Sequence, residues 1–283
     1  MSSIPRQLAT FAAVLAVLYT GGFIAGQFVE TGSHGSDDTH AAAGGHAAAP
    51  QPVRGLAVAD RGMRMVLATP EVEQGRPSEL RFSIVGADGR AIRDFDVAHE
   101  KRMHLIVVRR DGTGFQHLHP ELGEDGAWRA RTTIDRAGMH RVFADFTRDG
   151  TPVTLASDLR VDGDARLEPL APPRPVATTA GGYEVRLHAG GAAPGREAEL
   201  EFEITRGGRP VAPEPYLGAG GHLVALREGD LAYLHVHPTE HGGQHAGVGF
   251  AATFPTEGRY RLFLQFKHDG RVRTAAFTQL VSR

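Results

Sequence analysis

The chain carries one pattern twice, and this internal repeat constrains its fold more than any other feature of the sequence. Three pairs of segments match between the copies: GMRMVL at 62–67 with GYEVRL at 182–187, ELRFSI at 79–84 with ELEFEI at 199–204, and AGMHRVFADF at 137–146 with EGRYRLFLQF at 257–266. Each copy is long enough to enclose a hydrophobic core of its own. The repeat therefore predicts two domains of the same fold.

The pattern inside each copy is that of a β protein. Apolar residues alternate along short stretches rich in β-branched and aromatic residues, and Gly, Asp and Pro interrupt them, as in antiparallel sandwiches. Tyr260 stands where immunoglobulin-like sandwiches place the tyrosine of a corner motif, and its counterpart His140 is expected to make a structural hydrogen bond. We predict an all-β protein with two tandem immunoglobulin-like antiparallel β-sandwiches, at 54–162 and 177–283, joined by a proline-rich linker at 163–176.

Residues 1–30 predict a membrane anchor. The 21 residues from Leu8 to Phe28 carry no charge, and a helix of that length just crosses the hydrocarbon core of a bilayer. Arg6 precedes them, which favours a cytoplasmic N-terminus and an exported body. The alternative is a signal peptide and a secreted protein, but no small-x-small cleavage site follows the apolar run directly. In both interpretations the body is extracytoplasmic.

Residues 31–53 are small, polar and rich in Gly and Ala, which is typical of a flexible tether. The segment contains His34, His40 and His46 at intervals of six residues. These histidines either capture metal loosely or reflect drift in a low-complexity segment. Isolated imidazoles on a flexible chain bind weakly, because nothing organises them beforehand.

Charge and cysteine content exclude several classes of function. The 31 basic and 33 acidic residues give a net charge of −2 without a basic block, so we expect no nucleic-acid partner. The absence of cysteine excludes disulfides, thiolate metal sites and a cysteine nucleophile. Imidazole, carboxylate and thioether groups remain as metal ligands, and the 15 histidines become the residues to explain.

One histidine motif occurs in both copies without a gap. HLIVVRRDGTGFQHLHP at 104–120 aligns with HLVALREGDLAYLHVHP at 222–238, and each segment predicts a β-hairpin around a Gly-Asp or Asp-Gly turn. Such a hairpin places the first histidine directly opposite the last, and the middle histidine on the same face. Three imidazoles are therefore expected to converge in each copy: His104, His117 and His119 in the first, and His222, His235 and His237 in the second.

Three neutral imidazoles without a thiolate suit Cu(II), Zn(II) or Ni(II), and the usual order of affinities favours copper, with zinc as the alternative. We predict one metal site in each copy, against the alternative of hydrogen-bonding or pH-responsive histidines. His241 and His245 lie in a Gly-rich loop that either closes the second site or is solvated. Thioethers also suit Cu(I), but we expect core positions for Met63, Met65, Met103 and Met139.

The stretches MHLIVV, FQHLHP and GGHLVALREGDLAYLHVHP resemble segments of a known family. Over residues 54–283 the chain resembles secreted or membrane-anchored heavy-metal-associated proteins of actinobacteria. Its domains resemble immunoglobulin-like sandwiches of the YtkA and FixH type and, more distantly, periplasmic copper carriers of the CopC type. The resemblance implies metal handling beside a copper exporter, such as a metal-transporting ATPase, or an oxidase assembly factor. The N-terminal histidine of the copper carriers has no counterpart here, so their ligand set is not carried over.

Two other classes of function compete with metal binding. An enzyme is disfavoured: the second motif of cupin dioxygenases requires an Asn, which this chain lacks, and no Gly-x-Ser-x-Gly elbow of a hydrolase occurs. A non-catalytic interaction module of the cell envelope is the main alternative, because such sandwiches support many unrelated functions.

Overall fold

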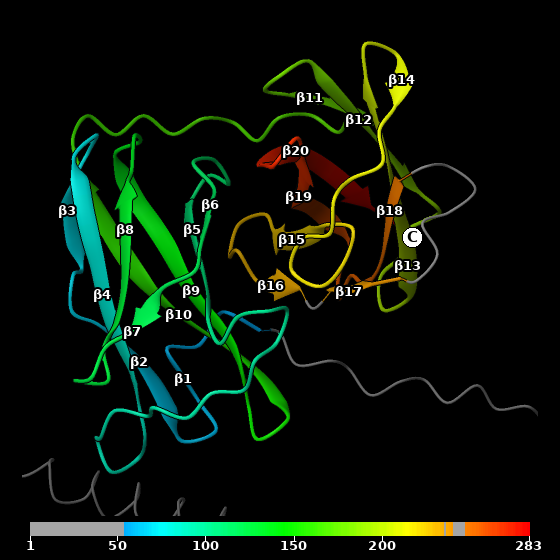
Figure 1. Ribbon diagram of the computed structural model, residues 1–283. Coiled ribbons are helices and arrows are strands. Elements are labelled where there is room, and N and C mark those ends of the chain that lie inside the picture. The colour runs from blue at the N-terminus through cyan, green and yellow to red at the C-terminus, as the bar shows by residue number, and fades with distance from the viewer. Residues whose placement is uncertain (1–53, 235, 240–246) are drawn as a thin grey trace, which may run out of the picture. The chain divides into compact units, whose positions relative to one another are not determined.

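The computed structural model describes residues 54–234, 236–239 and 247–283 (Figure 1). The predicted anchor, the tether and three of the predicted ligands, His235, His241 and His245, lie outside the described residues. Within the described part of the chain, no helix is long and apolar enough to cross a membrane.

The first domain is a sandwich of two sheets. One sheet has the order β1 (Ala59–Asp60), β2 (Met63–Leu67), β4 (Pro77–Val85), β8 (Trp128–Thr133) and β7 (Glu121–Leu122). The other has the order β3 (Glu71–Glu73), β10 (Thr151–Asp162), β9 (Gly138–Arg148), β5 (His104–Arg109) and β6 (Gln116–Leu118). Neighbouring strands are antiparallel except β3 and β10, which run parallel.

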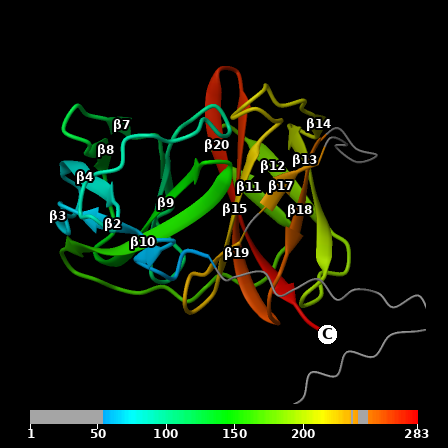
Figure 2. The same ribbon diagram turned by 90° about the horizontal axis from the view of Figure 1, so that it is seen from below.

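The second domain repeats this architecture (Figure 2). One sheet has the order β11 (Val176–Thr179), β12 (Tyr183–Ala189), β13 (Glu197–Arg206), β18 (Gly247–Thr253) and β17 (Val236–Pro238), and β14 (Arg209–Pro210) also pairs with β13. The other has the order β16 (Tyr233–Leu234), β15 (His222–Arg227), β19 (Gly258–His268) and β20 (Arg271–Val281). The segment between β10 and β11, which holds the prolines, forms no strand and runs between the domains as an extended connection (Figure 1).

The predicted all-β, tandem immunoglobulin-like fold is confirmed. Each domain has its own apolar core, and the corner of the second domain is formed by Tyr260, whose hydroxyl donates to the Thr256 carbonyl at 2.9 Å. His140 occupies the equivalent corner of the first domain and has a local partner, since its Nδ1 lies 3.1 Å from the Gly138 carbonyl. Met63, Met65 and Met103 are core residues as expected. Met139 is 44% exposed, because it alternates with core residues on β9, so its predicted core position is wrong.

A third apolar cluster joins the two domains. Strand β5 is buried along its whole length: alternate residues, such as Leu105, face the core of the first domain, whereas Ile106 and Val108 face outwards. These outward side chains share a cluster with Val224 and Leu226 of β15. A strand buried on both faces has an unbroken apolar sequence, and the two strands HLIVVR and HLVALR have this character.

The contact between the domains is made by equivalent residues of the two copies. Phe115 stacks on Phe263 with ring centroids 4.1 Å apart, and Tyr233 meets Phe143 at 5.5 Å. The repeat aligns Phe115 with Tyr233 and Phe143 with Phe263. The two domains therefore use the same face toward each other, as the subunits of a symmetric dimer do.

A short segment before β1 crosses this contact. The Arg54 carbonyl accepts a hydrogen bond from the Tyr233 backbone N–H at 2.9 Å. Gly55 follows with φ of +72°, and a Cβ atom there would lie 2.7 Å from the Tyr233 Cβ and 2.9 Å from the Phe143 ring. Only glycine fits the conformation and the space at this position.

We expect Phe263→Ala to loosen the domain contact, because the Phe263 ring is only 3% exposed and packs on Phe115. The free energy of unfolding should fall by about 3 kcal/mol, the usual cost of removing a buried aromatic ring. Denaturant unfolding measures that loss, and small-angle scattering should show a larger radius of gyration. Leu280→Ala, at an exposed position, is the matched control. An unchanged radius and unchanged stability of the Phe263 variant would contradict the assignment.

Candidate metal centre

Two histidines occupy equivalent positions at the start of the central strands. His104 is the first residue of β5 and lies opposite Asp145 of β9, and His222 is the first residue of β15 and lies opposite Gln265 of β19. Side chains alternate along each strand. Both histidine rings therefore project from the outer face of their sheet, whereas the next residue in each strand faces the core. The packing of the two outer faces brings these rings together: their centroids are 5.5 Å apart and the rings are stacked.

The hairpin of the first copy places two more imidazoles beside His104, as predicted. His117 pairs with Ile106, so its ring lies on the same outer face. His119 follows one step beyond the pair of Leu105 and Leu118. The ring centroids of His104, His117 and His119 are separated pairwise by 4.7 to 5.3 Å.

The hairpin of the second copy differs from the prediction. β16 pairs with β15 only through Tyr233 and Leu234, and the chain then enters the opposite sheet, where β17 pairs with β18. His237 is therefore opposite Ala251 and exposed, rather than opposite His222. The expected direct opposition of these two histidines is wrong because the hairpin changes sheets before it reaches His237.

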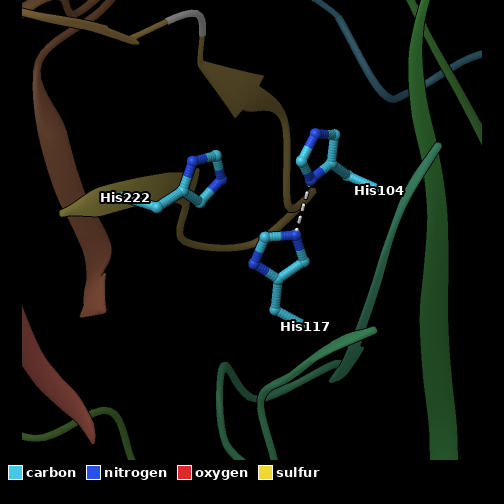
Figure 3. Close-up of side chains that lie close together, drawn as sticks. All are labelled: His104, His117 and His222. Carbon is cyan, nitrogen blue, oxygen red and sulfur yellow. Dashed lines mark hydrogen bonds between the residues drawn. The ribbon is translucent and has the colours of Figure 1, made fainter. Parts of the chain in front are cut away.

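Instead, His222 joins the histidines of the first copy. Its ring centroid lies 4.7 Å from that of His117. His104, His117 and His222 each offer one nitrogen, and these three nitrogens lie within 4.8 Å of one another (Figure 3). Among the described residues, the arrangement is thus one group of ligands shared by two domains, where the sequence predicted a separate site in each. We call His104, His117, His119 and His222 the histidine cluster.

Hydrogen bonds to two oxygen atoms orient two rings of the cluster. Nε2 of His104 lies 3.2 Å from the Ala98 carbonyl oxygen, and Nδ1 of His117 lies 2.7 Å from Oε1 of Gln265. Each of these nitrogens therefore carries the ring proton. The remaining nitrogens, Nδ1 of His104 and Nε2 of His117, face each other at 2.9 Å (Figure 3). Two lone pairs directed at one point repel each other unless a cation lies between them.

Burial keeps the cluster neutral. Desolvation is the largest cause that lowers the pKa of His222 to about 3 and that of His119 to about 4. Desolvation also lowers the pKa of His104 and, much further, that of His117, and the neighbouring imidazoles act in the same direction on His117. Neutral imidazole is the form that ligates a metal, so the cluster is ready to bind at neutral pH.

Two nitrogens of the cluster are buried and make no hydrogen bond within the described residues. Nε2 of His119 and Nε2 of His222 have no hydrogen-bond partner within the ranges that the structure describes. A buried polar atom without a partner costs free energy, and coordination of an ion offsets that cost. The three-nitrogen group fits a transition metal that prefers imidazole, and Nε2 of His119 is a further unpartnered nitrogen beside it.

Sequence reasoning missed three residues of this region. The ring of His99 lies 6.2 Å from that of His104 and 6.0 Å from that of His222. Asp145 accepts a hydrogen bond from Thr154 at 2.6 Å, and burial raises the pKa of its carboxyl group. The repeat aligns Asp145 with Gln265, and one polar residue inside each of the apolar stretches VFADF and LFLQF was the signal that could have revealed both. His99 lies in a turn, for which the motif gave no signal.

Comparison with known proteins yields similarities of fold only. No curated protein sequence matches the chain. Its structure is similar to FdeC, an adhesin of Escherichia coli, at 17% identity and a TM-score of 0.28, covering 80% of this chain and 66% of that one. It is also similar to the adhesin InvE of Yersinia pseudotuberculosis, at 11% identity and a TM-score of 0.26, covering 77% and 58%. At these TM-scores the similarities carry no argument about function.

The repeat has a counterpart among protein families. One family model matches residues 57–163 and matches again at residues 177–283, which together make up most of the chain. The chain therefore belongs to the family described as Domain of unknown function (DUF8832), of which it contains two tandem domains.

Proposed function

We propose that this protein binds one transition metal ion between its two domains, through His104, His117 and His222. The observation that carries the proposal is the group of three imidazole nitrogens that lie within 4.8 Å of one another, two of them only 2.9 Å apart. A metal ion offsets repulsion between such closely spaced lone pairs by coordination, and the outer hydrogen bonds to Ala98 and Gln265 resemble those that orient metal-bound histidines in general.

The distance between the two nitrogens favours copper as the ion. An ion placed at the usual metal–imidazole distance of about 2.0 Å from both would be held at an angle of about 90°, which is smaller than a tetrahedral angle. Angles of that size are typical of square-planar or tetragonal Cu(II) and Ni(II), and Cu(II) has the highest affinity for nitrogen sites. Zinc, which prefers a tetrahedral site, remains the alternative cargo.

A site with three protein ligands suits a protein that transfers its metal ion to a partner. His119 lies beside this group but outside it, so a fourth position is left for water or for a ligand of a partner, whereas closed structural sites use four protein ligands. We therefore propose binding and delivery or buffering of copper, without catalysis, outside the cytoplasm and attached to the membrane by the predicted anchor. The partner that this role requires is a metal-transporting ATPase or an oxidase assembly factor, in line with the family resemblance of the hairpin motifs.

An interaction module is the second candidate. It is supported by the fold, since paired immunoglobulin-like sandwiches offer open sheet edges, here β17 and β11, to other chains. In this alternative the cluster serves only to hold the domains together. The two candidates differ in one measurable property: the metal-binding protein binds one equivalent of metal tightly, whereas an interaction module requires no bound metal.

We expect the full-length protein to bind one tight equivalent of Cu(II), with a d–d absorption band and an EPR signal of nitrogen ligation. His222→Ala should weaken this binding at least tenfold, and so should His117→Ala, because the two residues belong to one site although they come from different domains. His188→Ala is the matched control, since His188 lies on β12 in the other sheet of the second domain. Wild-type affinity in the His222 variant would refute the shared site.

We also expect the metal-free protein to lose stability as pH falls. The pKa of His222 is about 3 in the folded state and about 6.5 in the unfolded chain, so the unfolded chain binds more protons between these values. The contribution of His222 to stability is then fully present above pH 6.5 and declines below it, by about 2 kcal/mol between pH 7.5 and 5. Urea unfolding at several pH values measures the slope, which should be shallower for His222→Ala than for His188→Ala.

A further inference from the structure

We propose that Gln265 is the positioning residue that makes His117 a metal ligand. Its side-chain carbonyl oxygen accepts a hydrogen bond from the Nδ1–H of His117, and this leaves the lone pair of Nε2 directed at the ion. The inference rests on the proposed function, which it deepens by naming what prepares the site.

The tautomer of His104 is fixed by its backbone partner. A neutral imidazole has one N–H and one lone pair, and a backbone carbonyl can only accept a hydrogen bond. The contact of His104 Nε2 with the Ala98 carbonyl therefore places the proton on Nε2 and the lone pair on Nδ1. Since Nδ1 is the atom that faces His117, whatever lies on that side of His104 must be a donor or a cation.

Hydrogen bonds hold the turn that presents the Ala98 carbonyl. Ala98 and Lys101 exchange both backbone hydrogen bonds, at 2.9 and 3.1 Å, and the two residues between them, His99 and Glu100, have positive φ values of 49° and 63°. The Glu100 carboxylate also accepts the backbone N–H of Gly218, in the second domain, at 3.1 Å. The orientation of His104 is thus supported from both domains.

Gln265 decides the tautomer of His117. With its oxygen toward His117, the amide nitrogen of Gln265 faces Thr274 Oγ1 at 3.4 Å, so both ends of the amide have partners. If the amide were turned over, its nitrogen would donate to Nδ1 of His117. The ring proton would then sit on Nε2 and donate to His104, and the result would be a closed hydrogen-bond chain without need of a metal. The direction of this one amide therefore distinguishes a metal ligand from a structural histidine.

Gln265 acts across the domain contact. It belongs to β19 of the second domain, whereas His117 belongs to β6 of the first. Its counterpart in the repeat is Asp145, which accepts a hydrogen bond from Thr154, whereas the amide nitrogen of Gln265 donates to Thr274. Each domain thus holds a polar side chain and a threonine at the same place beneath the cluster. Docking of the domains gives His117 its hydrogen-bond acceptor, so the metal ligand is oriented only when the domains are together.

The protonation pattern of the rings is directly measurable. In the metal-free full chain, long-range ¹H–¹⁵N NMR spectra of the imidazoles should show His117 protonated at Nδ1 and unprotonated at Nε2, with His117→Ala used to assign the signals. In Gln265→Leu the same ring should change to a mixture of tautomers. A wild-type ring protonated at Nε2 would overturn the inference, because it would mean that Gln265 donates.

Copper affinity gives the second test. Gln265→Leu, which removes the acceptor and keeps the size, should lower Cu(II) affinity by about 10- to 100-fold, as loss of an outer hydrogen bond to a metal-bound histidine usually does. Gln265→Glu keeps an acceptor and should bind copper at least as well as wild type. Gln279→Leu, the same exchange on β20, is the control and should have no effect.

The possible results distinguish failure of the Gln265 role from failure of the proposed function. If wild type binds no copper, the proposed function fails and the inference with it. If wild type binds copper and Gln265→Leu binds it equally well, only the role of Gln265 fails. Loss of binding in both Gln265→Leu and Gln265→Glu would also overturn the acceptor role. The NMR measurement on wild type decides the question even if a variant folds poorly.

Discussion

The apolar contact between the outer faces of two sheets is the interaction on which the rest of the structure depends. Strands β5 and β15 are each covered on both sides, by their own core and by the other domain. Burial of a Val, Leu or Ile side chain contributes about 1.5 to 3 kcal/mol, and several such residues meet here. This contact joins two sandwiches that could be independent through a largely apolar interface.

The histidine cluster owes its chemistry to its burial at that contact. His104 is only 3% exposed, and the depressed pKa values of the cluster have desolvation as their largest cause. The same low-polarity setting makes opposed lone pairs costly and coordination of an ion favourable. In the proposed function, metal binding and domain packing are two aspects of one arrangement, because the proposed ligands come from both domains and their outer hydrogen bonds do as well.

The two copies have diverged around a shared frame. The first keeps its histidine hairpin together through His119, whereas the second sends its last histidine, His237, to the opposite sheet. Beneath the cluster one copy has Asp145 and the other Gln265, each beside a threonine. A duplicated domain packed face to face in this way can build one asymmetric site from two nearly equivalent surfaces, as subunits of a dimer do at their interface.

The sequence by itself determined the two tandem β-sandwiches, the unbroken apolar character of β5 and β15, and the face on which His104 and His117 lie, because alternation and repeat alignment are local properties. Only the tertiary structure decided that His222 joins the first copy, that His237 does not, and that Gln265 contacts His117. These facts follow from how two sheets pack and where a hairpin changes sheets. Both depend on contacts between residues far apart in the chain, about which the period of a single strand carries no information.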